Sequence, residues 1–127
     1  MQVKKAALFV ARTRPGGWLL RKSWRWLHLK CFMELIQESR HWQAWQHPQP
    51  DYALHILLLP RYPYQNLLEL SHAGETVLAD LLNLTHCLVQ HYQLLSRGYR
   101  LIVNGGKYQQ FKLLHFHLVS DDPADPP

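Results

Sequence analysis

The chain has 127 residues, 47% of them hydrophobic and 12% aromatic, which suits one domain with a single core. Its formal net charge of +5 comes from residues 1–32, which carry eight basic and no acidic side chains, whereas the remainder has six basic against nine acidic ones. The two cysteines, Cys31 and Cys87, form no CxxC pair, which excludes a disulfide framework and favours a reducing, cytoplasmic setting. The apolar runs are too short to cross a bilayer, and we expect no secretion signal.

Residues 1–33 are expected to form a basic extension that contains several tryptophans, Trp18, Trp24 and Trp26 among them. Basic side chains interleaved with aromatic rings suit contact with nucleic acid or with an anionic membrane surface. Long basic side chains and tryptophans also commonly cover the flank of a domain, and we favour that interpretation because charge runs are weak motifs.

A domain is expected from residue 34 to residue 120. Short strands are predicted at 35–36 and 42–45, joined by a turn at 38–40. The prolines in 47–51 predict a loop, because each removes a backbone donor and restricts the residue before it. The nearly continuous apolar run 54–59 then predicts a buried strand that ends at Pro60.

A long helix is predicted as the main helix of the region Leu67 to Arg97, because apolar side chains recur at helical spacing from Val77 to Leu95. Ser71 is its predicted cap and Gly98 its stop signal. Two further strands are expected at 99–103 and 111–119. Strands on both sides of one helix, with hairpin-length connections, predict an α+β fold with an antiparallel sheet of about five strands. The acidic, proline-rich tail 121–127 is expected not to pack.

The segment 112–119 places two imidazoles on one face of an apolar strand. Side chains alternate across a strand, so Leu113, His115 and His117 share one face. Such a pair can ligate a metal, combine a nucleophile with an electrostatic helper, or lie on a solvated face. The other histidines are expected to serve packing or the surface: His28, His41, His72, His86 and His91.

Neutral hydrogen-bond donors surround the two imidazoles in the sequence. Asn104 ends the preceding strand, 105–106 are glycines that allow a close backbone approach, and Gln109 and Gln110 add amide groups. This set suits phosphate oxygens better than a metal ion. Zinc would need a third ligand, for which His55 is the obvious candidate, and carboxylates and thiols are absent nearby. We therefore expect neither a metal nor another cofactor.

Three segments together resemble the histidine-triad (HIT) superfamily of nucleotidyl hydrolases and transferases. Segment 109–117 is similar to the family's Gln-Ser/Thr-φ-x-His-φ-His-φ-His, where φ is apolar. Segment 99–106 resembles the strand and turn that carry the family's phosphate-contacting Asn, and 55–61 resembles its His-φ-φ-φ-φ-Pro-Lys/Arg strand. The resemblance covers about residues 34–120. The first histidine of the triad is Leu113 here.

The resemblance implies a nucleotide hydrolase or transferase acting on nucleoside phosphoramidates or dinucleoside polyphosphates. His115 would attack the α-phosphorus and form a nucleotidyl-histidine intermediate, with His117 as the second catalytic histidine. Asn104, Gln109, Gln110 and His55 would bind the substrate and its phosphate oxygens. The other ring nitrogen of His115 would donate to the backbone carbonyl of residue 113, which fixes its tautomer. The resemblance also implies a homodimer formed through the helix and an edge strand.

Two departures from the family keep other functions open. Leu113 removes a polar neighbour of the nucleophile and makes its surroundings drier. The acidic residue that the family uses to bind the ribose corresponds to positions 46–49, where this chain has Gln-His-Pro-Gln. The nearby acid, Asp51, lies outside these positions. The main alternative is therefore a non-catalytic nucleotide-binding or regulatory HIT-like module. A third alternative is an interaction protein that uses the basic N-terminus on RNA or a membrane.

Overall fold

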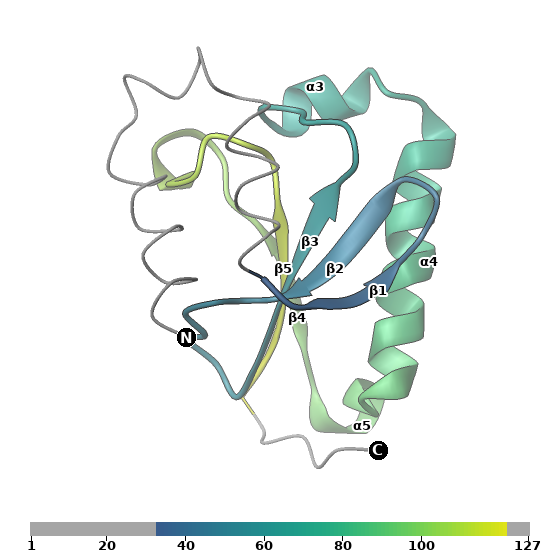
Figure 1. Ribbon diagram of the computed structural model, residues 1–127, viewed down its shortest axis with the longest axis vertical. Helices are drawn as coiled ribbons and strands as arrows, with labels where there is room; N and C mark the ends of the chain where they lie inside the picture. The colour runs from purple at the N-terminus through teal and green to yellow at the C-terminus, as the bar shows by residue number, and fades with distance from the viewer. Residues whose placement is uncertain (1–32, 122–127) are drawn as a thin grey trace.

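A computed structural model describes residues 33–121 of the chain (Figure 1). The basic extension up to residue 32, with Cys31, and the tail 122–127 lie outside the described residues, so the predictions made for them stay predictions.

The described part contains a five-stranded antiparallel sheet, which confirms the predicted α+β class. The strands lie in the order β1-β2-β3-β5-β4, so the strand that carries His117 is next to the strand that carries His55. Their bounds are β1 Leu35–Glu38, β2 Trp42–Gln46, β3 Leu54–Pro60, β4 Arg100–Val103 and β5 Phe116–Ser120.

The predicted long helix is interrupted. It consists of α3 (Leu67–Ser71), α4 (Glu75–His91) and α5 (Leu94–Arg97), and a 3₁₀ turn, η2 (Gly106–Tyr108), follows β4. The predicted cap was wrong: Ser71 ends α3, and Gly74, with φ of 102°, precedes α4. A residue with a side chain rarely adopts this φ, so the glycine permits the break between the helices.

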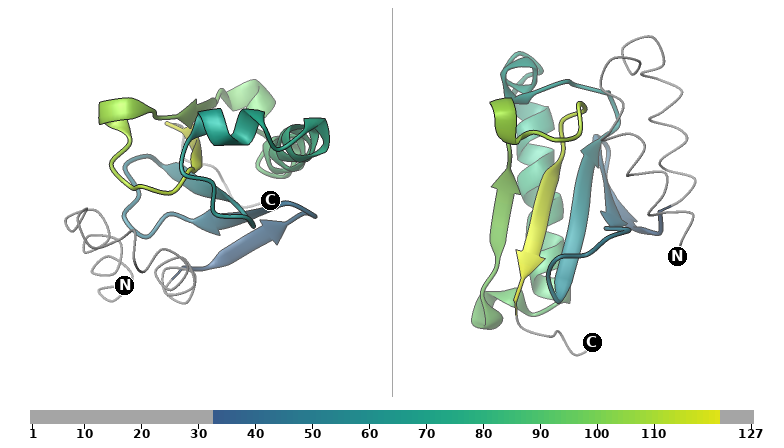
Figure 2. Two further views of the ribbon diagram at one scale, coloured as in Figure 1. Left: turned by 90° about the horizontal axis from the view of Figure 1, so that it is seen from above. Right: turned by 90° about the vertical axis from the view of Figure 1, so that its left-hand side faces the viewer.

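The helix α4 covers one face of the sheet, as the two views in Figure 2 show. The main core lies between them, and Trp42 joins the two layers because its indole Nε1 donates to the carbonyl oxygen of Val77 at 2.8 Å. The carboxylate of Asp80 on α4 also accepts hydrogen bonds of 2.7 Å from the Ser39 hydroxyl and the His41 amide. These bonds fix the turn between β1 and β2 against the helix.

The opposite face of the sheet carries a second, smaller apolar cluster. Strand β3 is buried along its whole length, and its alternate residues His55, Leu57 and Leu59 face away from α4. The cluster consists of Met33, Trp45, Leu57, Leu59, Phe111 and Leu113. None of the helices in the described range has the length and apolar character needed to span a membrane.

The predicted strand 111–119 begins only at Phe116, and the five residues before it are irregular. The predicted alternation still holds, because Leu114, Phe116 and Leu118 lie in the core under α4 whereas Leu113 lies in the second cluster. The two imidazoles therefore share the face of the sheet that is not covered by α4.

Candidate active site

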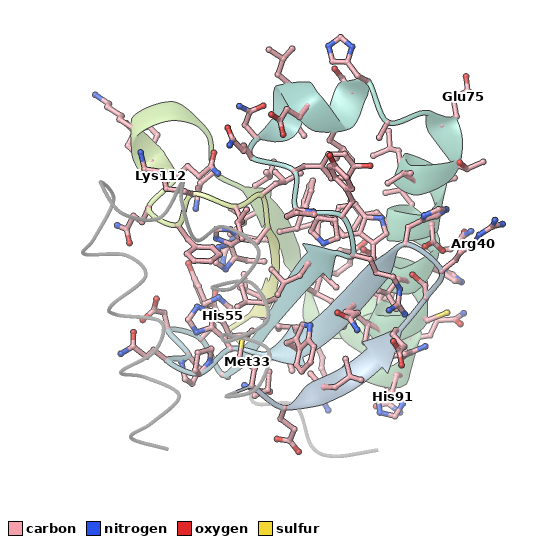
Figure 3. All side chains as sticks on the ribbon, turned by 45° about the horizontal axis from the view of Figure 1, so that its top comes forward. Met33, Arg40, His55, Glu75, His91 and Lys112 are labelled. Atoms are coloured by element: carbon pink, nitrogen blue, oxygen red, sulfur yellow. The ribbon has the colours of Figure 1, made fainter. Side chains whose placement is uncertain are left out.

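A cavity of about 290 Å³ lies on this face of the sheet, against β3 and the segment that leads into β5. Figure 3 shows His55 beside Met33, away from Glu75 and His91, which mark the ends of α4. Four histidines, His47, His55, His115 and His117, line the cavity together with Asn104 and Gln110. The cavity thus brings together five of the six predicted site residues, from β3 and from residues 104–117.

The backbone fixes the tautomer of His115. Its Nδ1 lies 2.8 Å from the backbone carbonyl oxygen of Leu113. Because a carbonyl only accepts, Nδ1 carries the proton and donates, and in the neutral ring the lone pair is on Nε2. The predicted bond to residue 113 is therefore present even though that residue is a leucine.

His55 and His117 form the second part of the arrangement. The amide of Asp51 donates to Nδ1 of His55 at 3.1 Å, so the His55 proton lies on Nε2. That Nε2 donates to Nδ1 of His117 at 2.9 Å, which leaves the His117 proton on its own Nε2. The two rings lie diagonally across β3 and β5, where Leu57 is directly opposite His117. His117 thus carries an N–H donor on a ring whose centroid lies 4.9 Å from that of His115.

Burial keeps these imidazoles neutral. Desolvation lowers the pKa of His115, and the bond to the Leu113 carbonyl opposes this to a smaller extent. Desolvation, with the nearby His115 and His55, lowers the pKa of His117 to about 3. Burial also lowers the pKa of His55, against the opposing charge of Asp51. At neutral pH burial therefore favours a neutral His115 with a lone pair on Nε2 and a neutral His117 with an N–H donor.

The structure separates the two predicted glutamines. Gln110 and Asn104 line the cavity. The Gln109 side chain instead donates from Nε2 to the backbone carbonyl of Gln65 at 2.6 Å, in the loop before α3. Gln109 therefore stabilises this loop. It is not among the residues that line the cavity, where the resemblance implied that it would bind phosphate.

Leu113 does not face the cavity. Its side chain is 1% exposed and packs in the second apolar cluster, while its backbone carbonyl serves His115. The position thus contributes packing and a main-chain acceptor to the site.

The sequence interpretation gave no role to His47, which lines the cavity from the loop after β2. Its ring stacks on His55, with ring centroids 4.0 Å apart, and its Nδ1 accepts from the amide of Gln49 at 2.9 Å. The only signal in the sequence was its place before Pro48, within the segment where the family has its ribose-binding acid. The start of the loop is held against β3 because the amide of His47 donates to the carbonyl oxygen of His55 at 3.0 Å.

His47, His55 and His117 also lie close enough together to surround a metal ion, with one ring nitrogen of each within 4.8 Å of the others. The hydrogen bonds oppose this use. A ligating histidine normally donates its second N–H to an acceptor, whereas the lone pairs of His47 and His55 already accept backbone amides. A metal at Nδ1 of either ring would displace the backbone amide, and a metal at Nε2 would require the ring proton to move to Nδ1, where it would face the same amide. These hydrogen bonds therefore do not fit a metal site.

Comparison with known proteins identifies the family. The HIT domain model matches residues 32–124. The chain belongs to the HIT family. An uncharacterized HIT-like protein of Synechococcus elongatus is 32% identical over 88 residues, which cover 68% of this chain and 76% of that protein. A second uncharacterized HIT-like protein, from Buchnera aphidicola, is 25% identical and covers 68% of this chain and 79% of its own length.

Solved structures agree with the fold of this HIT protein. A HIT family hydrolase from Legionella pneumophila Philadelphia 1 superposes with a TM-score of 0.65, at 23% identity over 71% of this chain and 82% of that one. A HIT family hydrolase from Clostridium thermocellum gives 0.64, at 24% identity over 75% and 84%. The family prediction is thereby confirmed.

Proposed function

We propose that this HIT protein is a nucleotide hydrolase or transferase that acts through a covalent nucleotidyl intermediate on His115. The observation that carries the proposal is the fixed tautomer of His115, whose Nδ1 donates to the Leu113 carbonyl at 2.8 Å and whose Nε2 lone pair belongs to a ring lining the cavity. A neutral imidazole is the nucleophilic form, and burial favours it. The HIT hydrolases with the same fold are consistent with this chemistry.

The reaction has two displacements. The His115 Nε2 lone pair forms a bond to the α-phosphorus while the bond to the leaving group breaks, and water then displaces the imidazole to release a nucleoside monophosphate. Substrates of both implied classes, nucleoside phosphoramidates and dinucleoside polyphosphates, contain such a phosphorus. A transferase would use another acceptor in place of water.

Neutral donors would stabilise the negative charge that develops on the phosphoryl oxygens. His117 supplies Nε2–H, and Asn104 and Gln110 supply amide groups at the same cavity. Donors whose positions are already fixed stabilise a transition state without reorganisation. His55 acts through His117 as a positioning residue, because it occupies Nδ1 of that ring.

Leu113 is the observation that favours the second candidate, a nucleotide-binding or regulatory module without turnover. The chain lacks the histidine that the family has at this position, and the leucine packs in the second apolar cluster together with Phe111. A module of this kind would bind nucleotide with the same donors and would form no covalent intermediate.

Two measurements distinguish these candidates. The full chain is incubated with adenosine 5′-phosphoramidate or with diadenosine polyphosphate, and released AMP is followed by chromatography. A brief reaction with substrate labelled at the α-phosphorus is then quenched in alkali, where phosphohistidine survives, and the intact mass is measured. Turnover with a nucleotidyl adduct that is absent in His115→Asn supports the enzyme. AMP binding without turnover supports the module and contradicts the proposal.

A further inference from the structure

Tyr108 lines the cavity from the turn η2, and the chemistry above does not use it. The residue is 70% exposed, whereas the apolar residues that line the same cavity, Met33, Leu57, Leu59 and Phe111, are buried. A large ring that lines a cavity and is still open to solvent can contact a ligand without any change in the core.

The backbone of the turn holds Tyr108 in place. Its amide donates to the carbonyl oxygen of Gly105 at 3.2 Å, and the amide of Gln109 donates to that of Gly106 at 3.0 Å. Gly106 has φ of 59°, a conformation that residues with side chains rarely adopt. The Gln109 side chain ties the end of the turn to Gln65. The exposed ring is therefore carried by a backbone of defined conformation.

The turn and the loop 47–51 lie at opposite ends of the cavity. The loop leads into the start of β3, whereas η2 follows Val103, which is opposite Phe116, itself opposite Leu58 near the end of β3. Figures 1 and 2 show the yellow-green turn at one end of the sheet and the loop between β2 and β3 at the other. Two groups attached to one bound phosphorus can therefore point to different ends.

The two ends also differ in charge. Asp51 lines the cavity from the loop 47–51. At the other end, the ammonium nitrogen of Lys107 lies 5.6 Å from the centroid of the Tyr108 ring. A chain of phosphates is attracted by the ammonium group and repelled by the carboxylate, and a nucleobase can stack on a tyrosine ring. The turn therefore suits a part of the substrate that is both anionic and aromatic.

We propose that Tyr108 and Lys107 bind the leaving group, which is the part of the substrate beyond the α-phosphorus. The Tyr108 ring stacks on a base and the Lys107 ammonium group pairs with the phosphates that precede it. The inference rests on the proposed function in taking a nucleoside phosphate as the ligand. Of the two substrate classes named there, it selects the dinucleoside polyphosphates over the phosphoramidates.

The test uses binding, so that it does not depend on turnover. Its ligands are analogues of ATP and of diadenosine triphosphate in which methylene groups replace the oxygens between the phosphates, so neither can be cleaved there. The two share three phosphates and differ by the second adenosine. We expect calorimetry with the full chain in EDTA to show about 5- to 10-fold tighter binding of the diadenosine analogue, because its second base can stack on an exposed ring. Equal affinities, or no binding of either ligand, overturn the inference.

Substitutions separate the ring from the charge. Tyr108→Leu should abolish the preference for the diadenosine analogue, whereas Tyr108→Phe keeps a ring and should retain it. Tyr62→Leu is the matched control, because Tyr62 is 65% exposed and is not among the residues that line the cavity.

Lys107→Gln should weaken both analogues about 2- to 5-fold in low salt and less in high salt, because the pairing lies at the surface. Lys112→Gln removes the same charge from the exposed segment after the turn and should have the smaller effect (Figure 3). Equal effects of the two substitutions would overturn the role of Lys107.

Two further results would contradict the inference. An unchanged preference in Tyr108→Leu would show that the second base does not reach the ring. An equal loss for AMP and for the diadenosine analogue in Tyr108→Leu would show that the residue supports the cavity or binds the first nucleoside. Turnover of a phosphoramidate and of diadenosine triphosphate is measured separately, so its absence contradicts only the proposed function.

Discussion

The backbone carbonyl of Leu113 and the imidazole of His115 are joined by a hydrogen bond of 2.8 Å that passes from Nδ1 of the histidine to the main chain two residues earlier. The bond depends on the backbone of residue 113 and not on its side chain. The position where this chain departs from the family therefore still fixes the tautomer of His115.

His115→Ala is expected to abolish turnover of a phosphoramidate while leaving the fold intact, because it removes the lone pair that forms the covalent bond. The side chain lines the cavity and belongs to neither apolar cluster, so the cost in stability should be small beside the loss of rate. Steady-state kinetics together with a thermal melt check this. Equal activity in the variant and the wild type would show that the hydrolysis comes from another site.

His117→Ala and Asn104→Ala should each lower kcat by about 10² to 10³-fold, if each acts as one donor to the developing negative charge. The two glutamines provide a matched comparison. Gln110→Ala should also slow the reaction, whereas Gln109→Ala should leave kcat near that of the wild type, because its amide binds the Gln65 carbonyl. A slower Gln109→Ala variant with an unchanged Gln110→Ala variant would contradict the assignment.

Leu113→His restores the residue typical of the family at a position that is 1% exposed. We expect it to cost about 1 to 3 kcal/mol of unfolding free energy, because an imidazole would be buried in an apolar cluster without a partner. No gain in turnover should accompany this loss. Chemical denaturation and phosphoramidate kinetics on one preparation test both parts, and a faster enzyme of unchanged stability would place this side chain in the cavity after all.

The free energy of unfolding should fall as the solution is acidified below about pH 6.5. Folding lowers the pKa values of His55, His115 and His117, so below the ordinary histidine pKa the unfolded chain binds protons that the folded chain does not. For His117 this loss continues down to about pH 3. It should be on the order of 1 kcal/mol per pH unit for each buried ring.

Urea denaturation at several pH values measures this dependence. His117→Asn should make the slope between pH 6 and pH 4 less steep, whereas His86→Asn, exposed on α4, should leave it unchanged. Equal slopes in all three proteins would mean that His117 titrates alike in the folded and unfolded chains.

The sequence predicted the sheet and the two imidazoles well because both depend on short-range alternation. The residues around His115 alternate between the face under α4 and the opposite face, and that pattern holds even where the backbone before Phe116 is irregular. The region Leu67 to Arg97 was predicted as one main helix capped at Ser71, whereas Gly74, with φ of 102°, separates α3 from α4.

His47 could not be found in the same way. It lies in a loop, where no periodicity applies, and its place in the cavity follows from the pairing of β2 with β3, in which Gln46 lies opposite Ile56. This register brings the loop amides onto His47 and His55. Similarly, Gln109 and Gln110 are adjacent in sequence, and only the turn after η2 decides which of them reaches the cavity.

The loop 47–51 has a further consequence for sequence variation. Its two prolines, Pro48 and Pro50, alternate with Gln49 and Asp51, the residues whose amides fix the protons of His47 and His55. Any side chain at 49 or 51 can supply that amide except proline, which has none. Exchanging each proline with the residue after it would leave the composition of the loop unchanged. It would remove both amides and with them the hydrogen bonds that fix the tautomers of His47 and His55.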